Sequence, residues 1–185
     1  MKIANPQGKG TDLLVNHWYP QPVLAEKPAK QIVIDYFSSS LVLSASFSFK
    51  PVVNKNYHLY WWNEELRMSL IEPEKLQRKS VSFIGSCSLK EDLTWNITFH
   101  HTLSTAARHH LQAFYEGFEQ HMQSGRPLSE LFPSFIDSLP YYRRLFASGL
   151  SKSLGISLAH LGLQDKTADY FGEYLLALNY THPSE

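Results

Sequence analysis

Histidine has the clearest potential for metal chemistry in this chain, which contains nine histidines. Two doublets, His100-His101 and His109-His110, lie around the start of a predicted helix, and imidazole binds transition metals well. Neighbouring residues on a helix point about 100° apart, whereas two ligands from one helix are normally three or four residues apart. A metal site would therefore need side chains from different turns or segments, and its candidates are His101, His109, His110 and Glu116.

Aromatic side chains offer a second chemistry, the recognition of a ligand or partner through ring contacts. Residues 57–62 read Tyr-His-Leu-Tyr-Trp-Trp, and a strand here would direct alternate residues to opposite faces of a sheet. If the face that carries His58, Tyr60 and Trp62 is open, it forms an aromatic recognition surface; the alternative is that an N-terminal arm or helices cover it. The candidate binding residues are Trp18, Tyr19, His58, Tyr60 and Trp62.

Nucleophilic and phosphate chemistries have weaker support. Cys87 shares a predicted strand face with Phe83 and Leu89, which favours a buried, inert thiol, and the sequence lacks a Gly-x-Ser-x-Gly elbow. The segment Gly8-Lys9-Gly10-Thr11 lacks the earlier glycine and the preceding strand of a phosphate-binding loop. Residues 141–144 (Tyr-Tyr-Arg-Arg) could clamp a phosphate, but we favour a helix with both arginines in solvent. We therefore assign no catalytic residue and no cofactor.

Composition limits the class of protein. The chain has 185 residues, of which 43% are hydrophobic and 18% charged, so we expect a single domain with one core. Seventeen basic and seventeen acidic side chains cancel, which argues against general nucleic-acid binding. The sequence contains no run of about 18 apolar residues, so it predicts no membrane span. A single cysteine fits a reducing compartment. We expect a cytoplasmic protein without a membrane partner.

Hydrophobic periodicity predicts an α+β fold. Residues 1–30 contain four prolines and are expected to form an extended arm. Alternating apolar residues between positions 40 and 100 predict an antiparallel β-meander of four or five strands within residues 31–100. The first predicted strand is Leu41–Phe49, and the others lie near residues 57–61, 66–70, 81–89 and 95–99.

From residue 102 the apolar period becomes that of a helix. A stripe from Leu103 to Met122 predicts one long helix that ends before Gly125 and Pro127, and Pro140 suits the start of a second helix. Asp165 is placed to cap a last helix that reaches residue 178. We expect this C-terminal set of helices, within residues 101–180, to pack against the apolar face of the sheet.

The middle of the chain also resembles a known family. The resemblance covers about residues 45–97 and is carried by these segments: Phe47-Ser48-Phe49-Lys50-Pro51-Val52-Val53, Tyr57-His58-Leu59-Tyr60, Ser69-Leu70-Ile71-Glu72-Pro73, Phe83-Ile84-Gly85 and Leu93-Thr94-Trp95. They resemble the uncharacterised family called domain of unknown function 2452, although Leu76 stands where such families often have a tryptophan. The resemblance implies a sheet and, because the family has no known activity, no catalytic residue.

Two functional hypotheses follow from these observations. The first is a non-catalytic binding or protein-interaction module, in which the aromatic strand and the N-terminal arm meet a protein or small-molecule partner. The second is a histidine-dependent metal-binding protein or enzyme that uses the region 100–121.

Overall fold

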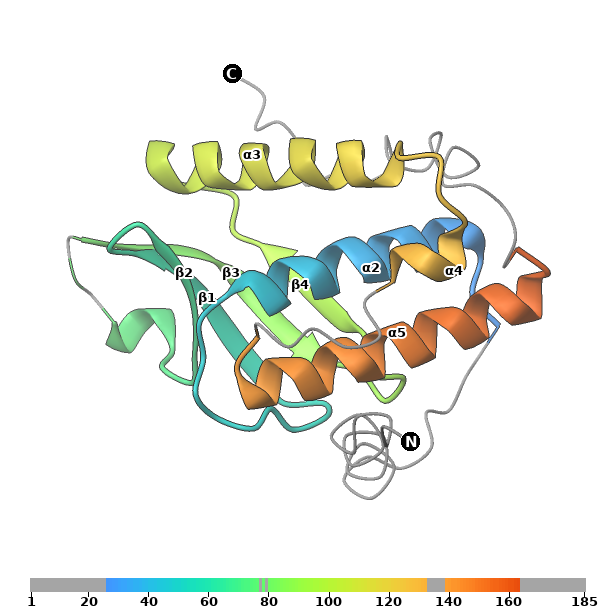
Figure 1. Cartoon of the computed structure of the whole chain (residues 1–185). Helices are drawn as coiled ribbons and strands as arrows, with labels where there is room; N and C mark the ends of the chain where they lie inside the picture. Colours follow the sequence, from blue (N-terminus) through green and yellow to red (C-terminus); the bar gives the residue numbers. More distant parts are fainter. Residues whose placement is uncertain (1–25, 77, 79, 133–138, 164–185) are drawn as a thin grey trace, which may run out of the picture.

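Four antiparallel strands form one sheet, which confirms the α+β class and the four strands predicted between residues 57 and 99. The computed structural model describes residues 26–76, 78, 80–132 and 139–163. The strands are β1 (Asn56–Trp62), β2 (Glu65–Ser69), β3 (Val81–Leu89) and β4 (Trp95–Phe99), in the spatial order β2-β1-β3-β4. β2 is therefore an edge strand, and β3 pairs with β1 (Figure 1).

The connections on either side of β2 differ in length. Asn63 and Glu64 form the two-residue turn from β1, and both have positive φ, as a tight hairpin turn of this kind requires. Residues 70–80 then lead to β3 and contain a short 3-10 turn at Pro73–Lys75. This longer connection passes β1 because β3 pairs with β1 and not with β2. The sheet is antiparallel as predicted, but its strand order is not that of the predicted meander.

A β-bulge in β3 changes which side chains face the helices. Leu59 pairs with Gly85, but the next residue, Tyr60, pairs with Phe83, so Ile84 has no partner on β1. Cys87 is buried on the helix side, as predicted, whereas Phe83 lies beside Tyr60 on the opposite face. The prediction that Phe83 shares a face with Cys87 is therefore wrong, because alternation shifts where a bulge inserts one residue.

Helix α2 (Ala29–Ser44) includes the first four residues of the strand predicted at Leu41–Phe49, and the rest of that segment forms no strand, so the prediction is wrong. The helix packs against β4 and α5, and its buried residues include the polar Asp35, Ser38 and Ser39. Because polar and apolar positions are buried alike, the segment has no helical stripe in its sequence. After α2, Ser46 makes one β-bridge to Arg67 of β2.

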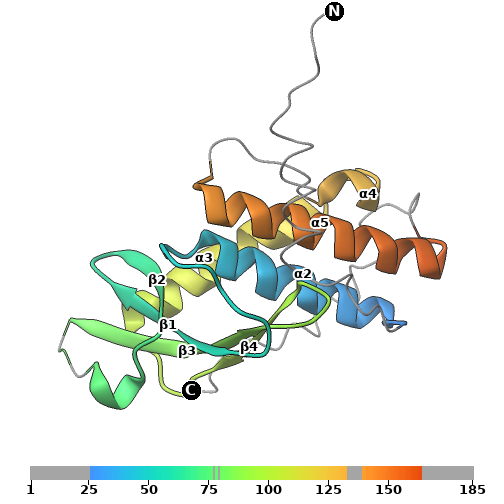
Figure 2. The ribbon, with the colours of Figure 1, turned by 90° about the horizontal axis from the view of Figure 1, so that it is seen from below.

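The remaining helices lie beside α2 on the same face of the sheet (Figures 1 and 2). They are α3 (Thr105–Met122), the short α4 (Leu128–Leu131) and α5 (Tyr141–Leu161), which confirms the predicted long helix and the helix after Pro140. Ser104 caps the start of α3, and its hydroxyl accepts a hydrogen bond from the amide of Ala107. The helix packs on α2 through ring contacts of Phe37 with Phe114 and Phe118.

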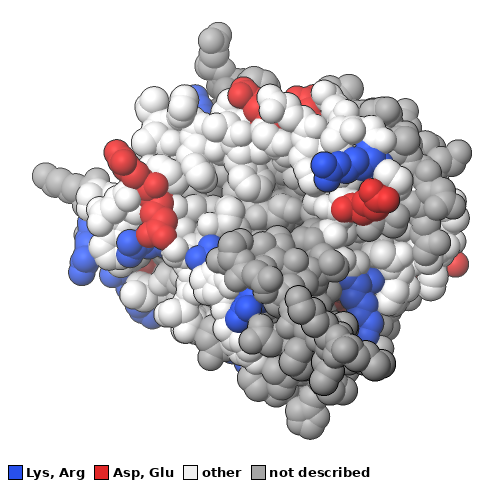
Figure 3. All heavy atoms as spheres, viewed as in Figure 1, with Lys and Arg blue, Asp and Glu red and all other residues white. Residues whose placement is uncertain are grey.

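Two predicted segments fall largely outside the described residues. The arm at 1–30 lies outside them up to residue 25, although residues 29 and 30 already belong to α2, and the helix after Asp165 lies wholly outside them. Within the described ranges, no helix combines the length and hydropathy that a membrane span requires. On the side seen in Figure 3, charged side chains of both signs are scattered singly or in small groups, in keeping with the zero formal net charge.

A buried polar cluster joins the start of α2 to the turn between β3 and β4. Asp35 is 1% exposed, and its carboxylate accepts hydrogen bonds from Lys27 at 2.5 Å and from Lys90 at 2.6 Å. Asp92 pairs with Lys27 and accepts a hydrogen bond from the Thr94 hydroxyl at 2.6 Å. Burial opposes ionisation of Asp92, but the hydrogen bonds from Lys27 and Thr94 and the charge of Lys27 hold its pKa below the ordinary value. Charge-assisted bonds thus fix the helix to this end of the sheet.

Candidate functional site

The aromatic candidates on β1 lie on the sheet face that points away from the helices. His58, Tyr60 and Trp62 alternate along the strand with Tyr57 and Leu59, which are buried in the core. The structure therefore brings three of the five predicted binding residues to one face. The other two, at positions 18 and 19, lie outside the described residues.

Tyr60 is covered by the connection from β2 to β3. Its side chain is 2% exposed, and its hydroxyl donates a hydrogen bond of 2.6 Å to the carbonyl of Ile71. Burial, together with the charges of Glu74 and Glu72, raises the pKa of Tyr60 to about 12. The ring of Phe83 lies 5.6 Å from the Tyr60 ring. Tyr60 thus contacts the connection, which covers this part of the face among the described residues.

Trp62 is half-buried and has two arginines near its ring. The guanidinium carbon of Arg67 lies 4.9 Å from the ring centroid, and that of Arg78 lies 5.5 Å from it. Such cation–π contacts orient an aromatic ring without removing it from solvent. Trp62 is therefore a positioned ring that keeps part of its surface open to a ligand.

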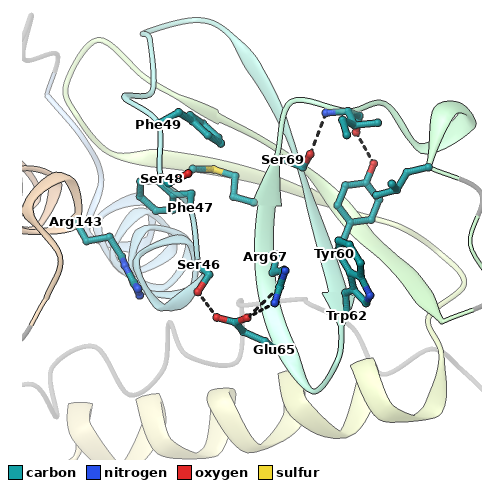
Figure 4. A pocket seen from close by; sticks show the side chains of 13 residues that line it. Ser46, Phe47, Ser48, Phe49, Tyr60, Trp62, Glu65, Arg67, Ser69 and Arg143 are labelled. Carbon is teal, nitrogen blue, oxygen red and sulfur yellow. Dashed lines mark hydrogen bonds and ion pairs between the residues drawn. The ribbon is translucent and has the colours of Figure 1, made fainter.

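A pocket of about 480 Å³ follows the outer edge of β2 (Figure 4). Phe47 and Phe49 line it from the segment after α2, while Tyr60 and Trp62 line it from β1. Arg143 reaches the pocket from the first turn of α5. Three parts of the chain that are far apart in sequence thus meet at one edge strand.

In the part of the chain that the structure describes, three charged side chains line this pocket, namely Glu65, Arg67 and Arg143. One carboxylate oxygen of Glu65 accepts a hydrogen bond from the Ser46 hydroxyl, and the other pairs with Arg67 at 2.9 Å. The bond from Ser46, with the bond from Arg67 and the charges of Arg67 and Arg143, outweighs desolvation and lowers the pKa of Glu65. Glu65 is therefore ionised at neutral pH.

The four metal candidates are not brought together. His110 packs its ring 4.3 Å from that of Trp61, and burial lowers its pKa. His101, His109 and Glu116 are exposed at separate points along residues 101–116. Within the part of the chain that the structure describes, no three His, Cys, Asp or Glu side chains are arranged to hold a metal ion.

Two residues with nucleophilic side chains, Ser86 and Cys87, belong to β3. The Ser86 hydroxyl is 3.2 Å from Nδ1 of His58, a distance that suits a serine–histidine pair. No described carboxylate hydrogen-bonds to His58, however, and such a group orients the base in catalytic triads. Burial raises the pKa of the Cys87 thiol to about 12, so the thiol is protonated at neutral pH.

Sequence reasoning missed the charged half of the pocket. Arg67 had a local signal, since the alternation of Glu65 and Arg67 with Leu66 and Met68 places both charged side chains on the Trp62 face. Arg143 was considered only as part of the basic patch at residues 141–144, for which a helix with both arginines in solvent was favoured. Its place in the pocket depends on how α5 packs beside the sheet, which the local sequence pattern does not show.

Comparisons with known proteins do not extend this description. No family model matches the chain, and no curated protein or solved structure is significantly similar to it. The resemblance to domain of unknown function 2452 therefore stays a prediction, and the functional argument rests on the geometry of the pocket.

Proposed function

We propose that this chain is a non-catalytic binding module that holds a small organic ligand in the pocket along the outer edge of β2. The observation that carries the proposal is the half-buried ring of Trp62, which lines the pocket and is positioned by Arg67 and Arg78. The volume of about 480 Å³ falls within the range of small-molecule sites. Such sites combine apolar rings with a few polar groups that orient the ligand, as this pocket does.

The same residues give less support to catalysis. Glu65 is the carboxylate that lines the pocket, and it is already engaged by Ser46 and Arg67. A carboxylate with a lowered pKa is a weak general base at neutral pH. Binding without chemistry is therefore the function that these groups favour. The cytoplasmic location stays a prediction from the sequence.

Titration with N-phenyl-1-naphthylamine tests the proposal, because this uncharged aromatic probe fluoresces strongly when it leaves water. We expect saturable binding of one equivalent to the full chain. Trp62→Ala should weaken binding about fivefold or more, since an aromatic contact contributes about 1 kcal/mol beyond burial. Leu161→Ala, which truncates an exposed side chain at the end of α5, is the matched control and should bind like the wild type.

Two results would contradict the proposal. One is the absence of saturable binding to the wild-type chain. The other is equal affinity of the wild type, Trp62→Ala and Trp62→Phe, because the probe would then bind elsewhere. Far-ultraviolet circular dichroism of each variant shows whether the fold is retained.

A further inference from the structure

Arg143 has more hydrogen-bonding capacity than its surroundings use. A guanidinium carries several N–H donors in a fixed fork, yet here it donates a long hydrogen bond of 3.4 Å to the carbonyl of Leu43. Its Nε is buried and has no hydrogen-bond partner among the described residues. No ion pair within the described ranges includes Arg143. A guanidinium that lines a pocket and has unused hydrogen-bond donors and no ion pair is complementary to an anion.

The charges around Arg143 favour the same class of ligand. Glu65 accepts hydrogen bonds from Ser46 on one oxygen and from Arg67 on the other, and no ion pair joins it to Arg143 among the described residues. Among the described residues, the lining contains two arginines and one glutamate, which leaves one positive charge in excess. Figure 4 shows Arg143 extending from α5 on the side of Ser46 and Phe47.

Apolar groups adjoin this charge along the pocket. The rings of Phe47 and Phe49 lie 5.8 Å apart on the same side of β2 as Arg143, and Trp62 lines the pocket on the other side of this edge strand (Figure 4). A bare inorganic ion would use the charge but leave these rings without a contact. A ligand with one anionic end and one apolar or aromatic part would use both.

We propose that the pocket binds an organic anion, whose carboxylate or phosphate pairs with Arg143 and whose apolar part lies between Phe47 and Trp62. This inference rests on the proposed function, because it assigns a ligand class to the same pocket. The pairing is a charge-assisted, bidentate contact of the kind that arginine makes with carboxylates and phosphates.

A pair of matched probes tests the inference on the full chain. 8-Anilinonaphthalene-1-sulfonate has the ring system of N-phenyl-1-naphthylamine and adds a sulfonate, so the ratio of the two affinities measures the effect of the negative charge. We expect the wild type to bind the sulfonate about tenfold more tightly or better. Arg143→Gln should bring the ratio close to one, whereas Arg108→Gln, which alters an exposed arginine on α3, should keep it.

The outcomes separate this inference from the proposed function. An affinity ratio that is equal in the wild type, Arg143→Gln and Arg143→Lys overturns the anion site, while saturable binding of the neutral probe near Trp62 would still support a binding module. If the wild type does not bind the neutral probe, both the anion site and the proposed binding function are overturned. Displacement of the sulfonate by benzoate or by phenyl phosphate distinguishes a carboxylate ligand from a phosphate ligand, and displacement by neither overturns the anion site.

Discussion

Replacing Asp35 by asparagine tests the buried polar cluster that joins α2 to the sheet. The substitution keeps the shape of the side chain but removes its charge. One carboxylate oxygen accepts hydrogen bonds from Lys90 and Gln31, and the other accepts one from Lys27. Asp35→Asn therefore leaves two lysine ammonium groups facing a neutral amide.

The expected loss follows from the burial of these groups. Removing one partner of a buried ion pair destabilises a protein by about 3–5 kcal/mol. Lys27 also pairs with Asp92, and the Lys90 side chain is 32% exposed and can turn toward water. Both features reduce the penalty, so we expect a loss of about 3 kcal/mol. For a chain of this size, that loss lowers the melting temperature by about 6–12 °C.

Urea unfolding followed by far-ultraviolet circular dichroism measures this loss, provided that the slope with denaturant stays the same. Glu72→Gln is the matched control, because it removes the exposed pair between Glu72 and Lys75 and should leave stability unchanged. A loss below about 1 kcal/mol for Asp35→Asn would show that the cluster does not hold α2 to the sheet.

Further predictions concern the sheet and two ionisable groups. Gly85→Ala should cost about 2 kcal/mol or more in urea unfolding, because a Cβ at Gly85 would lie 2.4 Å from the carbonyl oxygen of Thr98; an unchanged midpoint would contradict this. Because the pKa of Asp92 is lowered in the folded state, ionised Asp92 stabilises the fold at pH values above its ordinary pKa of 3.8. This stabilisation is lost as pH falls through the folded-state pKa, so the stability of Asp92→Asn should depend less on pH between about pH 5 and 2. Cys87 should react with a disulfide reagent such as Ellman's reagent only after unfolding, and fast reaction in native buffer would refute its burial.

The strands could be predicted because each has one face against the helices and one toward solvent. That arrangement produces a period of two, and β1, β2 and β4 lie where the alternation places them. Helix α2 could not be predicted in this way, because it is buried on most sides and carries polar residues inside. Ser39, for example, is fully buried and accepts a hydrogen bond from the amide of Trp95. The apolar alternation from Leu41 to Phe49 spans the end of this helix and the segment after it.

The pocket was predictable only in part for a related reason. Tyr60 and Trp62 belong to one strand, so their shared face follows from local geometry. The covering of Tyr60 depends on the strand order, which brings residues 70–76 across this face. Arg143 enters the pocket through the packing of α5, a contact between residues about a hundred positions apart in the chain.

The extra residue in β3 makes this strand tolerant of a change in length at one point. Because Ile84 is unpaired on β1, a variant that lacks it would straighten the ladder and still display Phe83 opposite Tyr60. Such a deletion would remove the fully buried side chain of Ile84 but would leave the aromatic side chains of the outer face in place. In an alignment, a one-residue gap at this position would therefore indicate the loss of a core side chain, while the outer face with Tyr60 and Phe83 would keep its arrangement.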